Sequence, residues 1–126
     1  MKIRLQCNSV RLRLKGSEVE QFARTGRVEE KITFGEAAGN SLFYVLETAD
    51  VSAPQARLTA NGVIVQVPAA AAARWITGTD VGLEGTQVVG EGECLHVLIE
   101  KDFACLNGTD EQNIDTFPHP LAGTKC

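Results

Sequence analysis

The chain has 126 residues, the size of one ordinary domain, and is long enough to bury a hydrophobic core without disulfides or a structural metal. Its composition, 44% apolar and 22% charged, is that of a soluble globular protein, and prolines and an Asn-Gly pair interrupt the longest nearly uncharged stretch, residues 51–73, which excludes a membrane helix there. The net charge of −4 is uneven: residues 1–31 carry eight Lys or Arg against four Glu, so they are +4 and the remainder is −8.

The first residues alternate polar with apolar and lack the apolar core of a secretory signal, so we expect a cytoplasmic protein. The cysteines are far apart in the sequence and contain no closely spaced pair: Cys7, Cys94, Cys105 and Cys126. Neither a disulfide framework nor a C-x-x-C motif is therefore predicted, and we expect free thiols.

The first third predicts two strands, a helix and two more strands. Residues 3–7 and 10–14 alternate apolar with polar around Asn8-Ser9, which indicates a hairpin. Ser17 and Glu20 have the spacing of a capping box, and Gly26 stands where a left-handed residue ends a helix, so we expect a helix over 18–25. Residues 28–34 and 42–46 alternate again and predict the second hairpin.

Residues 3–50 align with residues 56–103 at a constant offset of 53, with nine identities, and turn residues fall on turn residues. The second copy predicts a hairpin over 56–68 with Asn61-Gly62 at its tip, a helix over 69–76 and strands over 81–89 and 94–103. We therefore divide a single domain, 1–126, into repeat 1 (1–53), repeat 2 (54–106) and a tail (107–126).

One such unit is too small to bury its own apolar face. We expect an α+β, β-rich fold, in which two β-β-α-β-β repeats related by a pseudo-two-fold axis form a closed or nearly closed eight-strand barrel. The tail has no counterpart in the first half and reads as irregular, packed on the barrel by Phe117 and Leu121.

Several stretches of the chain support a resemblance: the Lys2-Ile3-Arg4 opening, residues 8–14 and 17–22, Glu100-Lys101-Asp102-Phe103 and Phe117-Pro118. With these it resembles a bacterial family of roughly 120-residue proteins without assigned function. A more local resemblance is to AbrB/MazE-like swapped-hairpin DNA-binding domains. It rests on Asn8-Ser9 with Arg13-Leu14 and on Asn61-Gly62 with Val67-Pro68.

The AbrB/MazE resemblance implies a nucleic-acid-binding site on the basic N-terminal hairpin, with Arg11, Arg13 and Lys15 as its cations. In the second copy Ile64 and Gln66 stand opposite Arg11 and Arg13, so half of a symmetric phosphate footprint is missing. The net charge of −4 also disfavours a nucleic-acid partner.

Two further groups of residues are candidates for chemistry. Cys105, His119 and Cys126 in the tail supply thiolates and an imidazole, the donors that zinc prefers, although no two of them lie within four residues of one another. The repeated Arg and Glu positions predict structural ion pairs from Arg4 to Glu47 and from Arg57 to Glu100.

We expect a small cytoplasmic binding or accessory domain, non-catalytic and without a cofactor, whose partner is another protein or a second copy of the chain. The alternatives are a nucleic-acid-binding regulator that uses the basic hairpin, and a metal- or thiol-dependent protein that uses the tail, where zinc would be the metal. No membrane partner is expected.

Overall fold

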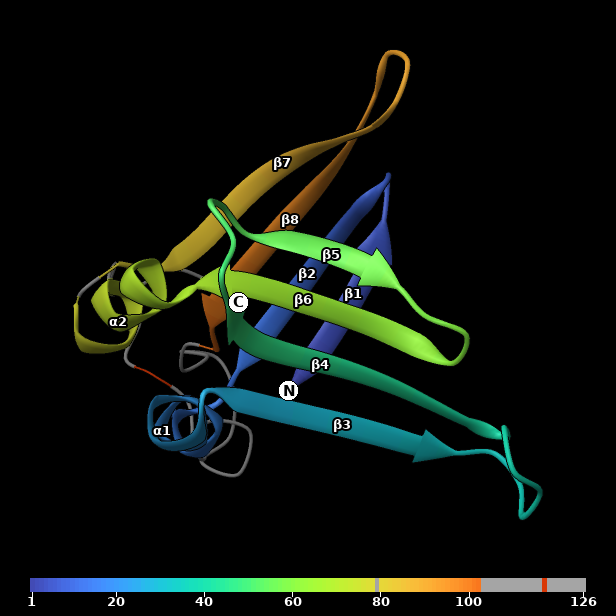
Figure 1. The fold of residues 1–126 in the computed structure, drawn as a ribbon. Helices are drawn as coiled ribbons and strands as arrows, with labels where there is room; N and C mark the ends of the chain where they lie inside the picture. The colour runs from blue at the N-terminus through green and yellow to red at the C-terminus, as the bar shows by residue number, and fades with distance from the viewer. Residues whose placement is uncertain (79, 103–116, 118–126) are drawn as a thin grey trace, which may run out of the picture.

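The computed structural model describes residues 1–78, 80–102 and 117. Eight strands and two helices follow one another along this part of the chain, as the sequence predicts (Figure 1). Their bounds are β1 Lys2–Gln6, β2 Ser9–Leu14, α1 Gly16–Thr25, β3 Arg27–Thr33, β4 Ser41–Ala49, β5 Gln55–Leu58, β6 Gly62–Pro68, α2 Ala69–Thr77, β7 Gly82–Gly90 and β8 Glu93–Lys101.

The strands form two four-stranded sheets, sheet A in the order β1-β2-β8-β7 and sheet B in the order β3-β4-β6-β5. Each sheet joins one antiparallel hairpin from residues 1–53 to one from residues 54–106, through the parallel pairs β2–β8 and β4–β6. The two sheets lie face to face with crossing strands, and both helices lie at the same end (Figure 1). The fold is therefore α+β and β-rich.

The core lies between the sheets because alternate residues of the central strands point inward. Leu12 of β2, Ile99 of β8, Leu46 of β4 and Val65 of β6 are completely buried. The helices close one end, where the rings of Phe22 and Trp75 meet edge to face at 6.3 Å between centroids. The remaining buried members are Met1, Val10, Leu14, Val19, Val28, Ala56, Val67, Ala72 and Val97.

The expected closed or nearly closed barrel is wrong, because side chains rather than strand ladders connect the sheet edges. Between β5 and β7, the Gln87 amide accepts from the Ala56 N–H at 2.7 Å and donates to the Ala56 carbonyl at 3.0 Å. Near β1 and β3, the buried Met1 ammonium contacts Glu30 at 2.8 Å and also Glu18. The Met1 ammonium donates a hydrogen bond to Glu30 and so lowers the pKa of that carboxyl.

The predictions for helix ends and turns have mixed outcomes. Gly26 ends α1 with a φ of 74°, as expected. The expected Ser17–Glu20 capping box is wrong: Lys15 is the N-cap, and its N–H donates to the Glu18 carboxylate at 2.9 Å.

The prediction that Gly62 lies at the tip of the second hairpin is wrong, because Gly62 is the first residue of β6. A Cβ there would lie 2.0 Å from the carbonyl oxygen of Phe43 on β4, so only glycine allows this close approach of the strands. In the first hairpin the turn is one residue earlier than Asn8-Ser9, since Cys7 and Asn8 have φ of 51° and 53°. Positive φ at both positions is what a type I′ turn requires.

Of the tail, the structure describes Phe117, which packs against the core as expected. Its N–H donates to the Asp102 carbonyl at 2.7 Å, and the Lys101 ammonium lies 5.3 Å from its ring centroid. Leu121 lies outside the described residues. No helix in the described ranges is long and apolar enough to cross a membrane.

Candidate functional site

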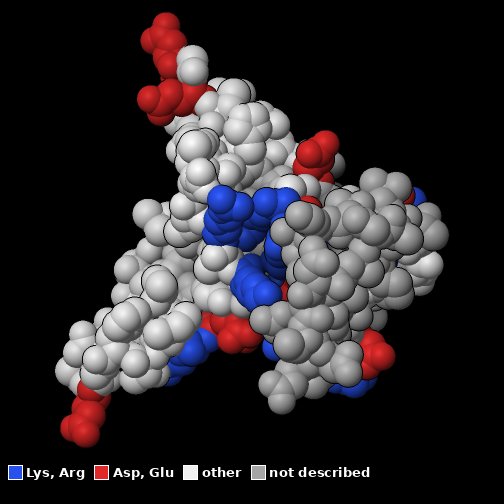
Figure 2. All heavy atoms as spheres, turned by 180° about the vertical axis from the view of Figure 1, so that it is seen from behind, with Lys and Arg blue, Asp and Glu red and all other residues white. Residues whose placement is uncertain are grey.

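The outer face of sheet A carries a cluster of cations, which we call the basic face: Lys2 and Arg4 of β1 with Arg11 and Arg13 of β2. Successive side chains of a strand point to opposite faces, so Ile3 and Leu12, which lie between these cations, point inward. The hairpin register then sets Lys2 opposite Arg13 and Arg4 opposite Arg11. Figure 2 shows a cluster of Lys and Arg atoms in the middle of this side of the molecule, with acidic atoms just below the cluster and others at the outer tips.

Glu100 of β8 is the central counter-charge of the basic face. The parallel register sets Glu100 opposite Arg13, and its carboxylate accepts from Arg11 and, at 3.1 Å, from Arg13. Burial raises the pKa of the Glu100 carboxyl, but the hydrogen bonds and charges of the two guanidinium groups outweigh it, so the pKa lies below its ordinary value. Glu100 is thus an anchored anion beneath two partly exposed cations.

The other two cations, Lys2 and Arg4, differ in whether a carboxylate contacts them. Lys2 contacts the Asp102 carboxylate at 3.2 Å, and the Arg4 Nε donates to the Gln6 side chain at 2.9 Å. Within the described part of the chain, Arg4 has no carboxylate within ion-pair distance. Arg4 is therefore the cation of the basic face that has no counter-charge among the described residues.

Three depressions of the surface adjoin the basic face, and Arg11 lines all of them. One of about 300 Å³ is lined by the four cations and Ile3, and one of about 290 Å³ continues along β1 to Cys7. The third, of about 550 Å³, lies over β7 and β8 and includes Glu84, Thr86 and His96. His96 is exposed, as the alternation of its strand predicts, and its Nδ1 lies 3.3 Å from the Thr86 hydroxyl.

The structure brings Arg11 and Arg13 together, whereas Lys15 lies beyond β2 at the start of α1 and is not part of the basic face. Sequence reasoning missed Lys2 and Arg4 as members. The alternation of β1 was a signal that Lys2 and Arg4 share one face, but their pairing with Arg13 and Arg11 depends on the turn at Cys7-Asn8, one residue earlier than predicted.

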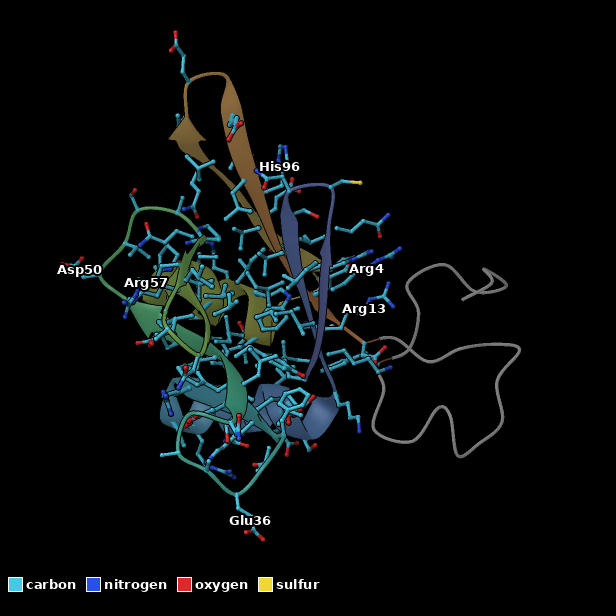
Figure 3. The ribbon with its side chains drawn as sticks, turned by 90° about the vertical axis from the view of Figure 1, so that its right-hand side faces the viewer. Arg4, Arg13, Glu36, Asp50, Arg57 and His96 are labelled. Carbon is cyan, nitrogen blue, oxygen red and sulfur yellow. The ribbon has the colours of Figure 1, made fainter. Side chains whose placement is uncertain are left out.

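The expected ion pairs of Arg4 with Glu47 and of Arg57 with Glu100 are wrong. Arg4 belongs to sheet A and Glu47 to sheet B, while Arg57 belongs to sheet B and Glu100 to sheet A. Figure 3 shows Arg4 and Arg13 pointing away from one side of the molecule and Arg57 lying on the other side.

The candidate zinc ligands Cys105, His119 and Cys126 lie outside the described residues, so the zinc site stays a prediction. Of the other thiols, Cys7 and Cys94 are free and exposed. Within residues 1–78, 80–102 and 117, no group of three His, Cys, Asp or Glu side chains is placed to hold a metal ion.

A family model described as a family of unknown function, DUF7009, matches residues 1–121, nearly the whole chain. The protein belongs to the DUF7009 family. This agrees with the resemblance to an uncharacterised family, whereas the match gives no support to the AbrB/MazE resemblance. The searches of curated proteins and of solved structures find no match.

Proposed function

We propose that this DUF7009 protein is a non-catalytic binding domain whose basic face receives an acidic segment of a partner protein. The observation that carries the proposal is an excess of positive charge at one place. Four cations share one face of two adjacent strands, and the described carboxylates that contact them are Glu100 and Asp102. An anionic ligand would balance the excess.

The accessibility of the cations supports the same function. Glu100 has 13% of its side-chain surface exposed, whereas Arg11 has 31% and Arg13 has 46%. A carboxylate held beneath two guanidinium groups restricts their motion and leaves part of each donor fork facing solvent. Guanidinium groups held in this way are suited to directed hydrogen bonds with carboxylate or phosphate oxygens.

The fold itself does not require these charges. At an offset of 53 residues, the positions that correspond to Lys2, Arg4, Arg11 and Arg13 on sheet B are Gln55, Arg57, Ile64 and Gln66. Sheet B forms with one cation at these four positions where sheet A has four. A structural role shared by the two sheets therefore does not account for the cluster, which supports a role of sheet A alone, and we assign ligand binding to it.

This comparison rests on a second inference, that the two halves are copies of one unit related by a pseudo-two-fold axis. The parallel ladders support it: Leu12 pairs with Ile99 in sheet A, and Val65 pairs with Leu46 in sheet B. These are equivalent pairs, because Leu12 corresponds to Val65 and Ile99 corresponds to Leu46 at the offset of 53 residues. Phe22 and Trp75, which also correspond, contact each other in the core.

The second candidate is a DNA-binding regulator of the AbrB/MazE type. The observation in its favour is that each sheet combines one hairpin from each half, as a fused pair of swapped-hairpin units would. The net charge of −4 weighs against it, and so does the presence of only one cation, Arg57, at the four corresponding positions of the second half. Phosphate contacts on both halves would need cations on both.

A titration with labelled ligands separates these functions. A fluorescein-labelled poly-glutamate peptide and a labelled DNA duplex are titrated at about 50 mM and about 200 mM salt. We expect salt-sensitive binding of the peptide, about three- to tenfold weaker in Arg4→Gln. Arg57→Gln, the corresponding exposed position on sheet B, is the matched control and should bind like the wild type.

Equal effects of the two substitutions, or no binding of the acidic peptide, would contradict the proposed site. Salt-sensitive DNA binding tighter than peptide binding would favour the regulator instead.

A further inference from the structure

We propose that the acidic segment binds in extended form as an added strand along the outer edge of β1, which pairs with no described strand, with acidic residues alternating with apolar ones. The inference rests on the proposed function and names the conformation and side-chain pattern of the ligand. Three observations support the inference: the outward hydrogen-bonding groups of β1, the arrangement of its side chains and a comparison with the corresponding edge of sheet B.

β1 is an edge strand, with β2 as its neighbour in sheet A. Gln6 and Ser9 flank the two-residue turn, so they form a hydrogen-bonded pair, and such pairs alternate along an antiparallel ladder. Arg4 and Lys2 then also bond to β2, whereas the N–H and C=O groups of Ile3 and Leu5 point away from it. Among the described residues, no backbone bond outside the ladders involves these two.

The corresponding edge of sheet B shows that such groups accept partners. Ala56 of β5 stands at the offset of 53 from Ile3, and it pairs with Val65 as Ile3 pairs with Leu12. Its outward N–H and carbonyl are both hydrogen-bonded by the Gln87 amide. In sheet B a side chain of the protein thus occupies this position, while the matching groups of Ile3 have no such partner in the described part of the chain.

The side chains of β1 match a strand of alternating character. Lys2 and Arg4 stand on the outer face, within the depressions that run along β1 to Cys7. Leu5 points to the inner face, yet 62% of its surface is exposed. An added strand would place its acidic residues beside Lys2 and Arg4 and its apolar residues over Leu5, because neighbouring strands align side chains on each face.

The test uses the full chain and an acetylated, amidated peptide of alternating Glu and Val. A peptide of the same composition, with all Glu before all Val, is the control ligand, and we expect it to bind about tenfold more weakly. Leu5→Pro removes one outward N–H, which an edge strand tolerates because that group makes no ladder bond. Leu5→Ala, which keeps the N–H, is its matched control.

We expect Leu5→Pro to bind the alternating peptide about tenfold more weakly than Leu5→Ala. Equal binding by the two variants, together with weakened binding by Arg4→Gln, would overturn strand addition and leave the proposed function intact. No binding of either peptide to the wild type would overturn both.

Hydrogen exchange keeps the test decisive if Leu5→Pro does not fold. In the wild type, saturation with the alternating peptide should slow amide exchange at Ile3 and Leu5, because their N–H groups become hydrogen-bonded. Exchange at Arg57 and Leu58 on β5 should not change. Bound peptide with unchanged exchange at Ile3 and Leu5 would overturn the proposal.

Discussion

At the scale of single residues, Glu100 shows how one carboxylate arranges two cations. Its folded-state pKa is depressed, because the guanidinium groups of Arg11 and Arg13 outweigh its burial. The stability that its ionisation contributes is therefore complete above the unfolded pKa of about 4.3. That stability is lost as the pH falls through the folded-state pKa.

We predict that Glu100→Gln lowers the free energy of unfolding at neutral pH by about 1–3 kcal/mol, because it removes the charged acceptor that Arg11 and Arg13 share. Urea unfolding at pH 7 and below pH 4 measures the effect, which should shrink in acid. Glu84→Gln, an exposed change on β7, is the control and should be near neutral. An equal loss at both pH values would contradict the charge-based explanation.

At the scale of elements, the start of α1 differs from the sequence prediction, because Lys15 and Glu18 cap the helix in place of Ser17 and Glu20. The Glu18 carboxylate accepts from the Lys15 N–H and contacts the Met1 ammonium, whereas Glu20 is exposed. We predict that Glu18→Ala lowers the free energy of unfolding by about 1–2 kcal/mol, the loss of a helix cap. Glu20→Ala should change it by less than about 0.5 kcal/mol. Thermal or urea unfolding of both variants measures the two losses. A larger loss of stability in Glu20→Ala than in Glu18→Ala would contradict the Lys15–Glu18 cap and favour the Ser17–Glu20 capping box.

The elements also show which features local sequence determines. All ten elements were predicted, because alternation and helix propensity act within a few residues, and Gly26 was correct because a helix end is local. The role of Gly62 was not predictable, since it depends on the Phe43 carbonyl of a strand brought alongside by the fold. The contact of Arg11 with Glu100 likewise requires the β2–β8 register, which no local pattern reveals.

At the scale of the whole molecule, each sheet combines one hairpin from each half of the chain, and we call this arrangement the exchange of hairpins. Because of it, neither half can form its sheets without the other. Sheet A takes its parallel pair from β2 and β8, and sheet B takes its pair from β4 and β6, so neither half contains a complete sheet. The contact between Phe22 and Trp75 also crosses from one half to the other. Separated halves would each expose one side of this core to water.

We therefore predict that a fragment of residues 1–53 and a fragment of residues 54–126 do not fold as monomers, and that mixing them restores the fold. Trp75, the single tryptophan, is completely buried and lies in the second fragment, so its fluorescence reports the assembly. The emission should shift to shorter wavelength on mixing and show a cooperative urea transition. The intact chain is the control for both signals. Cooperative unfolding of either fragment alone as a monomer would contradict the exchange, because it would require a core that one half supplies by itself.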